Sequence, residues 1–254
     1  MTNFVTATDG VAIAYDVIGD GPPVVLVHGF AANRAITWRN TNWYEWLTSA
    51  GRQVIALDCR GHGMSAKPHE KEAYDDRLML ADVLAVLDAL GLRAADVVGY
   101  SMGGYLAINL MHEAPGRVRR AVIAGVGESY FSFWASSAEI IAQGLLAPDA
   151  AAIADPQALE FRRFSERAGG DLVALAACML RPRLSFGADE LKRILQPILV
   201  VCGEQDETSG RPEPLARAFA AARAVVVPRR NHHSTVGDPL FKQAVKDFLD
   251  SGPP

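Results

Sequence analysis

The sequence contains few cysteines, and their spacing matches neither a disulfide framework nor a cysteine-based metal site. Three occur in 254 residues, Cys59, Cys178 and Cys202. No two of them form a C-x-x-C pair, and an odd number at scattered positions is typical of proteins from reducing compartments. We therefore expect a chain that is stabilised by its hydrophobic core.

Signals for secretion, membrane insertion and binding to polyanions are also absent. The first ten residues, MTNFVTATDG, have neither a basic segment nor the long apolar segment of a signal peptide, and no run of about 18 apolar residues occurs. With 25 Lys and Arg against 29 Asp and Glu, the formal net charge is −4, which provides no broad positive field. The sequence predicts a cytoplasmic protein that binds neither nucleic acid nor membranes, and it leaves the oligomeric state open.

Short apolar runs alternate with helical patterns along much of the chain. Half of the residues (50%) are hydrophobic, enough to form the buried core of one α/β domain. Leu78 to Leu90 has apolar residues at helical spacing, and Gly91 follows as a stop signal. An antiparallel pair is expected at the start, from Phe4 to Thr8 and from Val11 to Val17. Runs typical of strands covered on both faces are Val24–Val27, Val54–Leu57, Val97–Val98, Val118–Ile123 and Ile198–Val201. This alternation predicts a mostly parallel sheet flanked by helices.

Residues 128–195 interrupt the alternation. They are rich in alanine and have a helical pattern with no convincing strand, so we expect a small helical lid inserted between two core segments, 1–127 and 196–254. Aromatic residues are concentrated at its beginning, where Tyr130, Phe133 and Trp134 are candidates for lining an acyl or aromatic pocket. Taken singly, each is explained equally well by packing of the insertion onto the core.

The stretch GYSMGG, from Gly99 to Gly104, places a serine between glycines after an apolar run and before a helical pattern that extends to His112. This is the sequence form of a nucleophile elbow. Ser101 would occupy a strained turn between strand and helix, where larger neighbours would hold the two elements apart. Such a short match also arises by chance, so a catalytic role for Ser101 requires suitable partner residues elsewhere in the chain. It needs a base, an acid that orients the base, and donors for a developing oxyanion.

The candidate acid follows the last long apolar run. Asp206 lies just beyond Ile198–Val201, and therefore at the same carboxyl edge of the sheet as Ser101. Glu204 and Glu207 lie in the same loop and are alternatives, although each is more simply explained as a solvated loop charge. We expect Asp206 to orient the base.

Two adjacent histidines, His232 and His233, follow a short predicted strand from Ala224 to Val227, and either one could be the base. The order serine, acid, histidine, together with the elbow, resembles the α/β-hydrolase-fold serine hydrolases over nearly the whole chain. In the relatives that the chain resembles, the histidine precedes a helix-starting proline by seven positions. Counted back from Pro239, this spacing implies His232 as the base and places His233 toward the substrate pocket.

The segment from Val27 to Phe30 resembles the H-G loop of the same family. The resemblance implies that the backbone amides of Phe30 and Met102 form the oxyanion hole. Gly29 permits the backbone to turn its amides toward the substrate. His28 lies beside it and is a candidate substrate contact. It could be taken for a second catalytic histidine, but it is more simply explained as a residue that hydrogen-bonds within the loop and holds its shape.

The segment from Asp58 to Ser65 resembles the family's D-x-R-G-x-G-x-S motif. From their chemistry, Asp58 and Arg60 are expected to pair with each other or with backbone groups. Asp58 and His62 also have the character of metal ligands. No further residue at ligand spacing accompanies them, so no metal site is expected.

The resemblance implies a serine hydrolase of the esterase or lactonase type that needs no cofactor or metal. It would cleave a small carboxylic ester through an acyl-enzyme intermediate. A serine at the elbow disfavours relatives that form alkyl-enzyme esters. A lactonase, thioesterase, C–C bond hydrolase or acyltransferase remains possible, as does a non-catalytic ligand-binding protein. Residues expected to contact the small-molecule acyl substrate are His28, Gly29, Tyr130, Phe133, Trp134 and His233.

Overall fold

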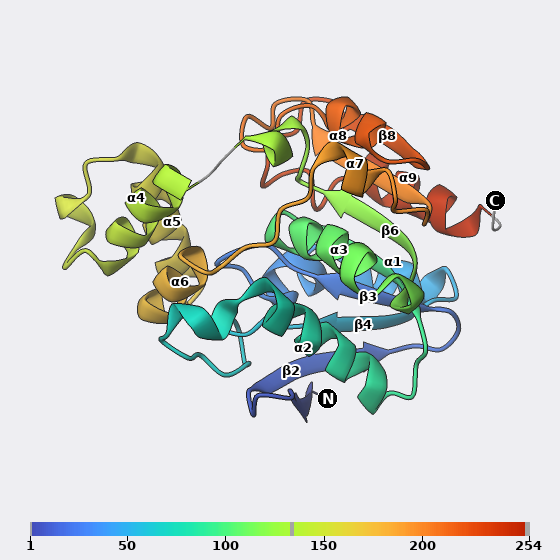
Figure 1. The fold of residues 1–254 in the computed structure, drawn as a ribbon, viewed down its shortest axis with the longest axis horizontal. Helices are drawn as coiled ribbons and strands as arrows, with labels where there is room; N and C mark the ends of the chain where they lie inside the picture. The colour runs from blue at the N-terminus through green and yellow to red at the C-terminus, as the bar shows by residue number, and fades with distance from the viewer. Residues whose placement is uncertain (1, 133–134, 252–254) are drawn as a thin grey trace.

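An 8-stranded sheet runs through the centre of the computed structural model, which describes residues 2–132 and 135–251 (Figure 1). β1 is antiparallel to β2 and β2 to β4, while the other neighbours are parallel. In order across the sheet, the strands are β1 (Thr2–Thr6), β2 (Ala12–Ile18), β4 (Gln53–Leu57), β3 (Pro23–Val27), β5 (Ala95–Tyr100), β6 (Val118–Ala124), β7 (Ile198–Gly203) and β8 (Ala222–Val227). The predicted antiparallel pair and the predicted parallel strands are confirmed.

Helices cover both faces of the sheet, which explains why β3, β5 and β7 are buried along their whole lengths. α2 (Asp76–Ala89), α3 (Met102–Glu113) and α8 (Pro212–Ala218) contribute to the apolar core on one face. α1 (Trp43–Ser49) and α9 (Pro239–Asp250) contribute to the core on the other. Adjacent residues of β3 alternate between the two cores, with Val25 in the first and Leu26 in the second.

The helix predicted for residues 78–90 begins slightly earlier, because a polar cap precedes it. The side chain of Asp75 accepts a hydrogen bond from the backbone N–H of Arg77, and α2 starts at Asp76. Short helical turns join several of the longer elements. They are η1 (Ala35–Arg39), η2 (Lys71–Tyr74), η3 (Pro115–Arg117), η4 (Glu128–Phe131) and η5 (Ala150–Ala152).

The described part of segment 128–195 is helical and contains no strand, as expected. Its main helices are α4 (Ala135–Leu146), α5 (Pro156–Arg167), α6 (Leu172–Met179) and α7 (Ala188–Leu191). Figure 1 shows α4, α5 and α6 as a group to one side of the sheet. These helices share an apolar cluster with Ala31, which follows β3, whereas Phe186 and Leu191 join the main core. That this segment acts as a lid stays a prediction.

Candidate functional site

The turn between β5 and α3 has the geometry of a nucleophile elbow. Ser101 has φ 53° and ψ −113°, a left-handed conformation that a residue other than glycine rarely adopts. A Cβ atom added to Gly99 would lie 2.1 Å from the carbonyl oxygen of Gly103, and one added to Gly103 would lie 2.1 Å from that of Val27. The two glycines are therefore required for strand and helix to approach this closely.

Three side chains from distant parts of the chain form a continuous hydrogen-bonded series. The Oγ atom of Ser101 lies 3.0 Å from Nε2 of His232, and Nδ1 of His232 lies 2.9 Å from Oδ2 of Asp206. A carboxylate only accepts hydrogen bonds, so Nδ1 carries the imidazole proton and Nε2 is the acceptor for the serine hydroxyl. This arrangement places a base against the serine and a carboxylate behind the base.

The carboxylate of Asp206 is shielded from water, with the residue 4% exposed. Burial acts to raise its pKa, but the hydrogen bond and charge of His232, together with two donors from Ser209, outweigh burial and hold the pKa below the usual range. Asp206 is therefore ionised at neutral pH. An ionised carboxylate at Nδ1 stabilises an imidazolium if His232 takes up a proton.

The alternative acid and base residues lie elsewhere. His233 is exposed, and its Nε2 atom lies 3.4 Å from Oε1 of Glu160. Glu204 is also exposed and accepts a hydrogen bond from the backbone N–H of Arg229. Glu207 is exposed as well. Of these candidates, His232 is the one that contacts Ser101, and Asp206 is the one that contacts His232.

Two residues at the site were missed by the sequence analysis, Tyr100 and Ser209. The hydroxyl of Tyr100 donates to the backbone carbonyl of His232, and the two rings lie 5.5 Å apart. Ser209 contacts both Asp206 and His232 through its hydroxyl group. Their positions in the sequence could have indicated that they lie near the site, because Tyr100 directly precedes Ser101 and Ser209 lies three residues after Asp206.

The loop after β3 lies directly against the elbow. A Cβ atom on Gly29 would be 3.3 Å from Cβ of Ser101. The backbone N–H of Phe30 has no hydrogen-bond acceptor among residues 2–132 and 135–251. The same holds for Met102, whose N–H is one of the free donors in the first turn of α3. These two amides are available to bind an oxyanion.

His28 is completely buried and holds this loop in place. Its Nε2 atom accepts a hydrogen bond from the backbone N–H of Cys59 at 3.0 Å, so the proton is on Nδ1, which lies 2.7 Å from the carbonyl oxygen of Gly29. Burial lowers the pKa of His28 and keeps the ring neutral. Both ring nitrogens are occupied by the backbone, as in the interpretation that His28 maintains the loop, and neither is free to bind a substrate.

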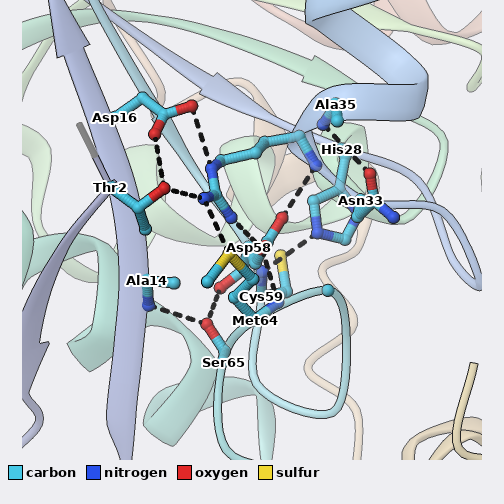
Figure 2. A network of polar contacts seen from close by, with 12 residues as sticks. Thr2, Ala14, Asp16, His28, Asn33, Ala35, Asp58, Cys59, Met64 and Ser65 are labelled. Carbon is cyan, nitrogen blue, oxygen red and sulfur yellow. Dashed lines mark hydrogen bonds and ion pairs between the residues drawn. The ribbon is translucent and has the colours of Figure 1, made fainter.

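A buried ionic network lies beside His28 (Figure 2). The guanidinium group of Arg34 donates to Asp16 and to Asp58, and the backbone N–H of Arg34 donates to Asp58 at 2.8 Å. Asp58 also accepts from the backbone N–H of Met64 at 2.7 Å. The network therefore joins the loop after β3 to the turn after β4.

The expected pairing of Asp58 with Arg60 needs a correction. Arg60 is completely buried, and its guanidinium group instead donates to Asp82 and Asp9. The two side chains leave the turn in different directions, so Asp58 pairs with the loop after β3, and Arg60 joins the turn to α2 and to the hairpin between β1 and β2. The other expectation, that Asp58 pairs with backbone groups, is confirmed by its hydrogen bond from the backbone N–H of Met64.

Helix α5 contacts the loop after β3 and the loop that carries His232 and His233. The ring of Phe161 packs edge-on against Phe30, with centroids 5.7 Å apart. One turn later, Phe164 lies 5.7 Å from the ring of His233, next to His232. All three phenylalanine rings are partly exposed. Apolar aromatic surface thus borders the neighbourhood of Ser101.

The remaining aromatic candidates are Tyr130, Phe133 and Trp134. Tyr130 stacks on Tyr105, four residues after Ser101, and its hydroxyl accepts a hydrogen bond from the backbone N–H of Phe186. It therefore lies where the segment after α6 returns to the core. Phe133 and Trp134 lie outside the residues that the structure describes.

Comparison with known proteins supplies the family. The model for the alpha/beta hydrolase fold matches residues 22–148, half of the chain. The chain belongs to the α/β-hydrolase family. A solved hydrolase from Pseudomonas aeruginosa is 29% identical, with a TM-score of 0.83 and 98% of each chain covered. This match confirms the predicted fold class.

Two curated relatives of this α/β hydrolase come from Pseudomonas putida. The 2-hydroxy-6-oxo-2,4-heptadienoate hydrolase is 40% identical over 44% of this chain and 41% of its own length. The dihydrolipoyllysine-residue acetyltransferase component of an acetoin cleaving system is 32% identical over 84% of this chain and 59% of its own length. The aligned region thus spans about half the length of these two relatives.

The described residues of this α/β hydrolase form neither a cluster of metal ligands nor a membrane-spanning helix. Within residues 2–132 and 135–251, no group of three or more His, Cys, Asp or Glu side chains is placed to hold a metal ion. His62, considered with Asp58 as a ligand, instead points Nδ1 at the carbonyl oxygen of Arg60, 2.9 Å away. No helix in the described ranges is both long and apolar enough to cross a bilayer.

Proposed function

We propose that this α/β hydrolase cleaves a small carboxylic ester through an acyl-enzyme intermediate on Ser101. The observation that carries the proposal is the 3.0 Å contact between Oγ of Ser101 and Nε2 of His232, with Asp206 bound at the other ring nitrogen. A serine hydroxyl is a weak nucleophile at neutral pH, and a base within hydrogen-bonding distance is what activates it. No step of the mechanism requires a metal or cofactor.

In the first half of the reaction, Nε2 of His232 takes the hydroxyl proton as Oγ of Ser101 attacks the acyl carbonyl carbon. Asp206 stabilises the imidazolium that forms. The N–H groups of Phe30 and Met102 donate to the developing oxyanion, and each such donor contributes about 3 kcal/mol to transition-state stabilisation. His232 then gives its proton to the leaving alcohol, and the acyl group stays on the serine.

In the second half, His232 removes a proton from water as the water oxygen attacks the acyl carbon. The bond from that carbon to Oγ of Ser101 then breaks, His232 returns the proton to Oγ, and the acid is released. The partly exposed rings of Phe30, Phe161 and Phe164 support an apolar group on the substrate, because covering them removes apolar surface from water. The same three side chains serve lactonases, thioesterases, C–C bond hydrolases and acyltransferases, so the ester is the first choice among several acyl compounds.

A fluorophosphonate probe tests the catalytic assignment. The wild-type chain should be labelled at one site, and Ser101→Ala should lose the label, because only an activated serine reacts with the probe. Ser185→Ala, which removes an exposed serine, should retain it. A wild-type chain that stays unlabelled would favour the non-catalytic binding protein.

The substrate is tested by p-nitrophenyl esters of increasing chain length beside a panel of small lactones, with competing alcohols and amines as acyl acceptors. Hydrolysis of short esters is the expected result. Preferential turnover of lactones, or transfer to the added acceptor in place of water, would replace the ester proposal by a lactonase or an acyltransferase.

Tyr100→Phe should lower both stability and activity. The substitution leaves the carbonyl of His232 without its donor, which costs about 1–3 kcal/mol of unfolding free energy. The loop that carries the base would also lose an anchor, and we expect kcat to fall about fivefold. Urea denaturation and ester hydrolysis measure the two effects.

Tyr74→Phe is the matched control, because the buried hydroxyl of Tyr74 also donates to a backbone carbonyl, that of Pro68 at 2.6 Å, on a different loop. It should destabilise the chain to a similar extent and leave kcat unchanged. Equal kcat values in the two variants would show that Tyr100 has no role beyond stability.

A further inference from the structure

Ser209 is buried beside the acid and the base, with 1% of the residue exposed. Its hydroxyl oxygen lies 2.8 Å from Oδ2 of Asp206 and 3.2 Å from Nδ1 of His232. Its backbone N–H donates to the other carboxylate oxygen, Oδ1, at 2.9 Å. One residue thus contacts both oxygens of the carboxylate as well as the imidazole.

The direction of these hydrogen bonds follows from what each group can donate. The carboxylate accepts only, and Nδ1 of His232 uses its proton toward Asp206, so the hydroxyl proton of Ser209 points to Oδ2. A lone pair of the hydroxyl oxygen then faces the N–H at Nδ1. In this arrangement the carboxylate cannot rotate about its Cβ–Cγ bond without breaking bonds to Ser209 and His232.

The backbone and side-chain contacts of Ser209 have separable effects. The N–H bond to Oδ1 belongs to the turn that follows β7, and it would persist with any residue except proline at this position. The hydroxyl bond depends on the side chain alone. Because the site is closed to water at this point, no solvent molecule competes for the Oδ2 lone pair that the hydroxyl occupies.

We propose that the hydroxyl of Ser209 is a positioning group for the Ser101, His232 and Asp206 series, fixing the carboxylate plane and, through it, the direction of Nε2. This inference rests on the proposed function. Ser209 does not touch the substrate or the reacting atoms, and it acts by holding Asp206. A small displacement of a catalytic base costs much of its rate contribution.

The same contact affects the hydrogen bond between His232 and Asp206. The Nδ1 proton of His232 points to the carboxylate, and the hydroxyl oxygen of Ser209 lies beside it. Removing the hydroxyl takes one donor from Oδ2, so the environment of this proton should change in Ser209→Ala. The rings packed against His232 are those of Tyr100 and His233, and neither is altered by the substitution.

The test compares Ser209→Ala and Ser209→Thr with the wild type on a p-nitrophenyl ester, with active sites counted by fluorophosphonate labelling. In Ser209→Ala, we expect kcat per labelled site to fall about tenfold, with KM within twofold. Ser209→Thr, which keeps the hydroxyl, should recover most of the loss.

Ser165→Ala is the matched control, since it removes a buried hydroxyl that has no partner in the described ranges. It should leave kcat unchanged. Values of kcat within twofold of wild type in Ser209→Ala would overturn the proposal.

A readout without substrate separates this inference from the proposed function. Nuclear magnetic resonance of protein with ¹⁵N-labelled histidine follows the Nδ1 proton of His232, whose resonance should shift in Ser209→Ala. An unlabelled, inactive wild type in which Ser209→Ala still shifts this resonance would refute the ester hydrolase and retain the positioning role. An unshifted resonance would refute the positioning role, whatever the substrate.

Discussion

Replacing His232 with alanine should lower kcat on a reactive ester by about 10⁴- to 10⁶-fold. The imidazole is the only group bound to Oγ of Ser101 through a side-chain hydrogen bond in the described ranges, so without it the hydroxyl keeps its proton. Asp206 cannot substitute, because it faces the opposite ring nitrogen. Steady-state hydrolysis, with folding checked by thermal denaturation, measures the loss.

His233→Ala provides an internal control from the next residue in the chain. Its ring lies 5.8 Å from that of His232, but its hydrogen-bond partner is the exposed Glu160. The interaction between two exposed groups contributes little, and we expect kcat to change less than about threefold. A greater loss in His233→Ala than in His232→Ala would reverse the assignment of the base.

The sequence predicts the sheet and the elbow because both depend on local constraints. Buried parallel strands need continuous apolar residues, and the elbow needs glycines where a Cβ would collide, as at Gly99 and Gly103. The acid is predicted from its place at the end of β7. These features are visible in single segments, without knowledge of which segments meet in space.

Contacts between distant segments could not be predicted in the same way. Nothing local to Arg34 shows that its guanidinium group meets Asp16 and Asp58. Of the two alternatives expected for Asp58 and Arg60, the pair with each other is therefore absent, whereas bonds to backbone groups are present. Likewise, the resemblance to the family favours His232 over His233, but only the contact with Ser101 distinguishes the two rings physically. Side-chain pairing is set by tertiary packing, which no run of residues encodes alone.

Arg34→Met should be among the most destabilising substitutions away from the elbow. Arg34 is 5% exposed, and its partners Asp16 and Asp58 are 2% and 1% exposed. Methionine fills similar space but leaves two buried carboxylates without this cation, and breaking a buried ion pair in this way costs about 3–5 kcal/mol. Urea denaturation should show a lower midpoint with an unchanged slope.

Arg77→Met is the corresponding control, because Arg77 pairs with Glu113 at 3.3 Å on the surface, with 64% of its side chain exposed. Solvent screens that pair, and its loss should cost less than about 1 kcal/mol. The difference between the two variants would therefore measure what burial adds to an ion pair in this protein.

Equal, small losses of stability in the two variants would mean that Arg39, Tyr44 and the backbone donors satisfy Asp16 and Asp58 without Arg34. In that case the connection between the loop after β3 and the turn after β4 would depend on His28 and the backbone bond to Asp58.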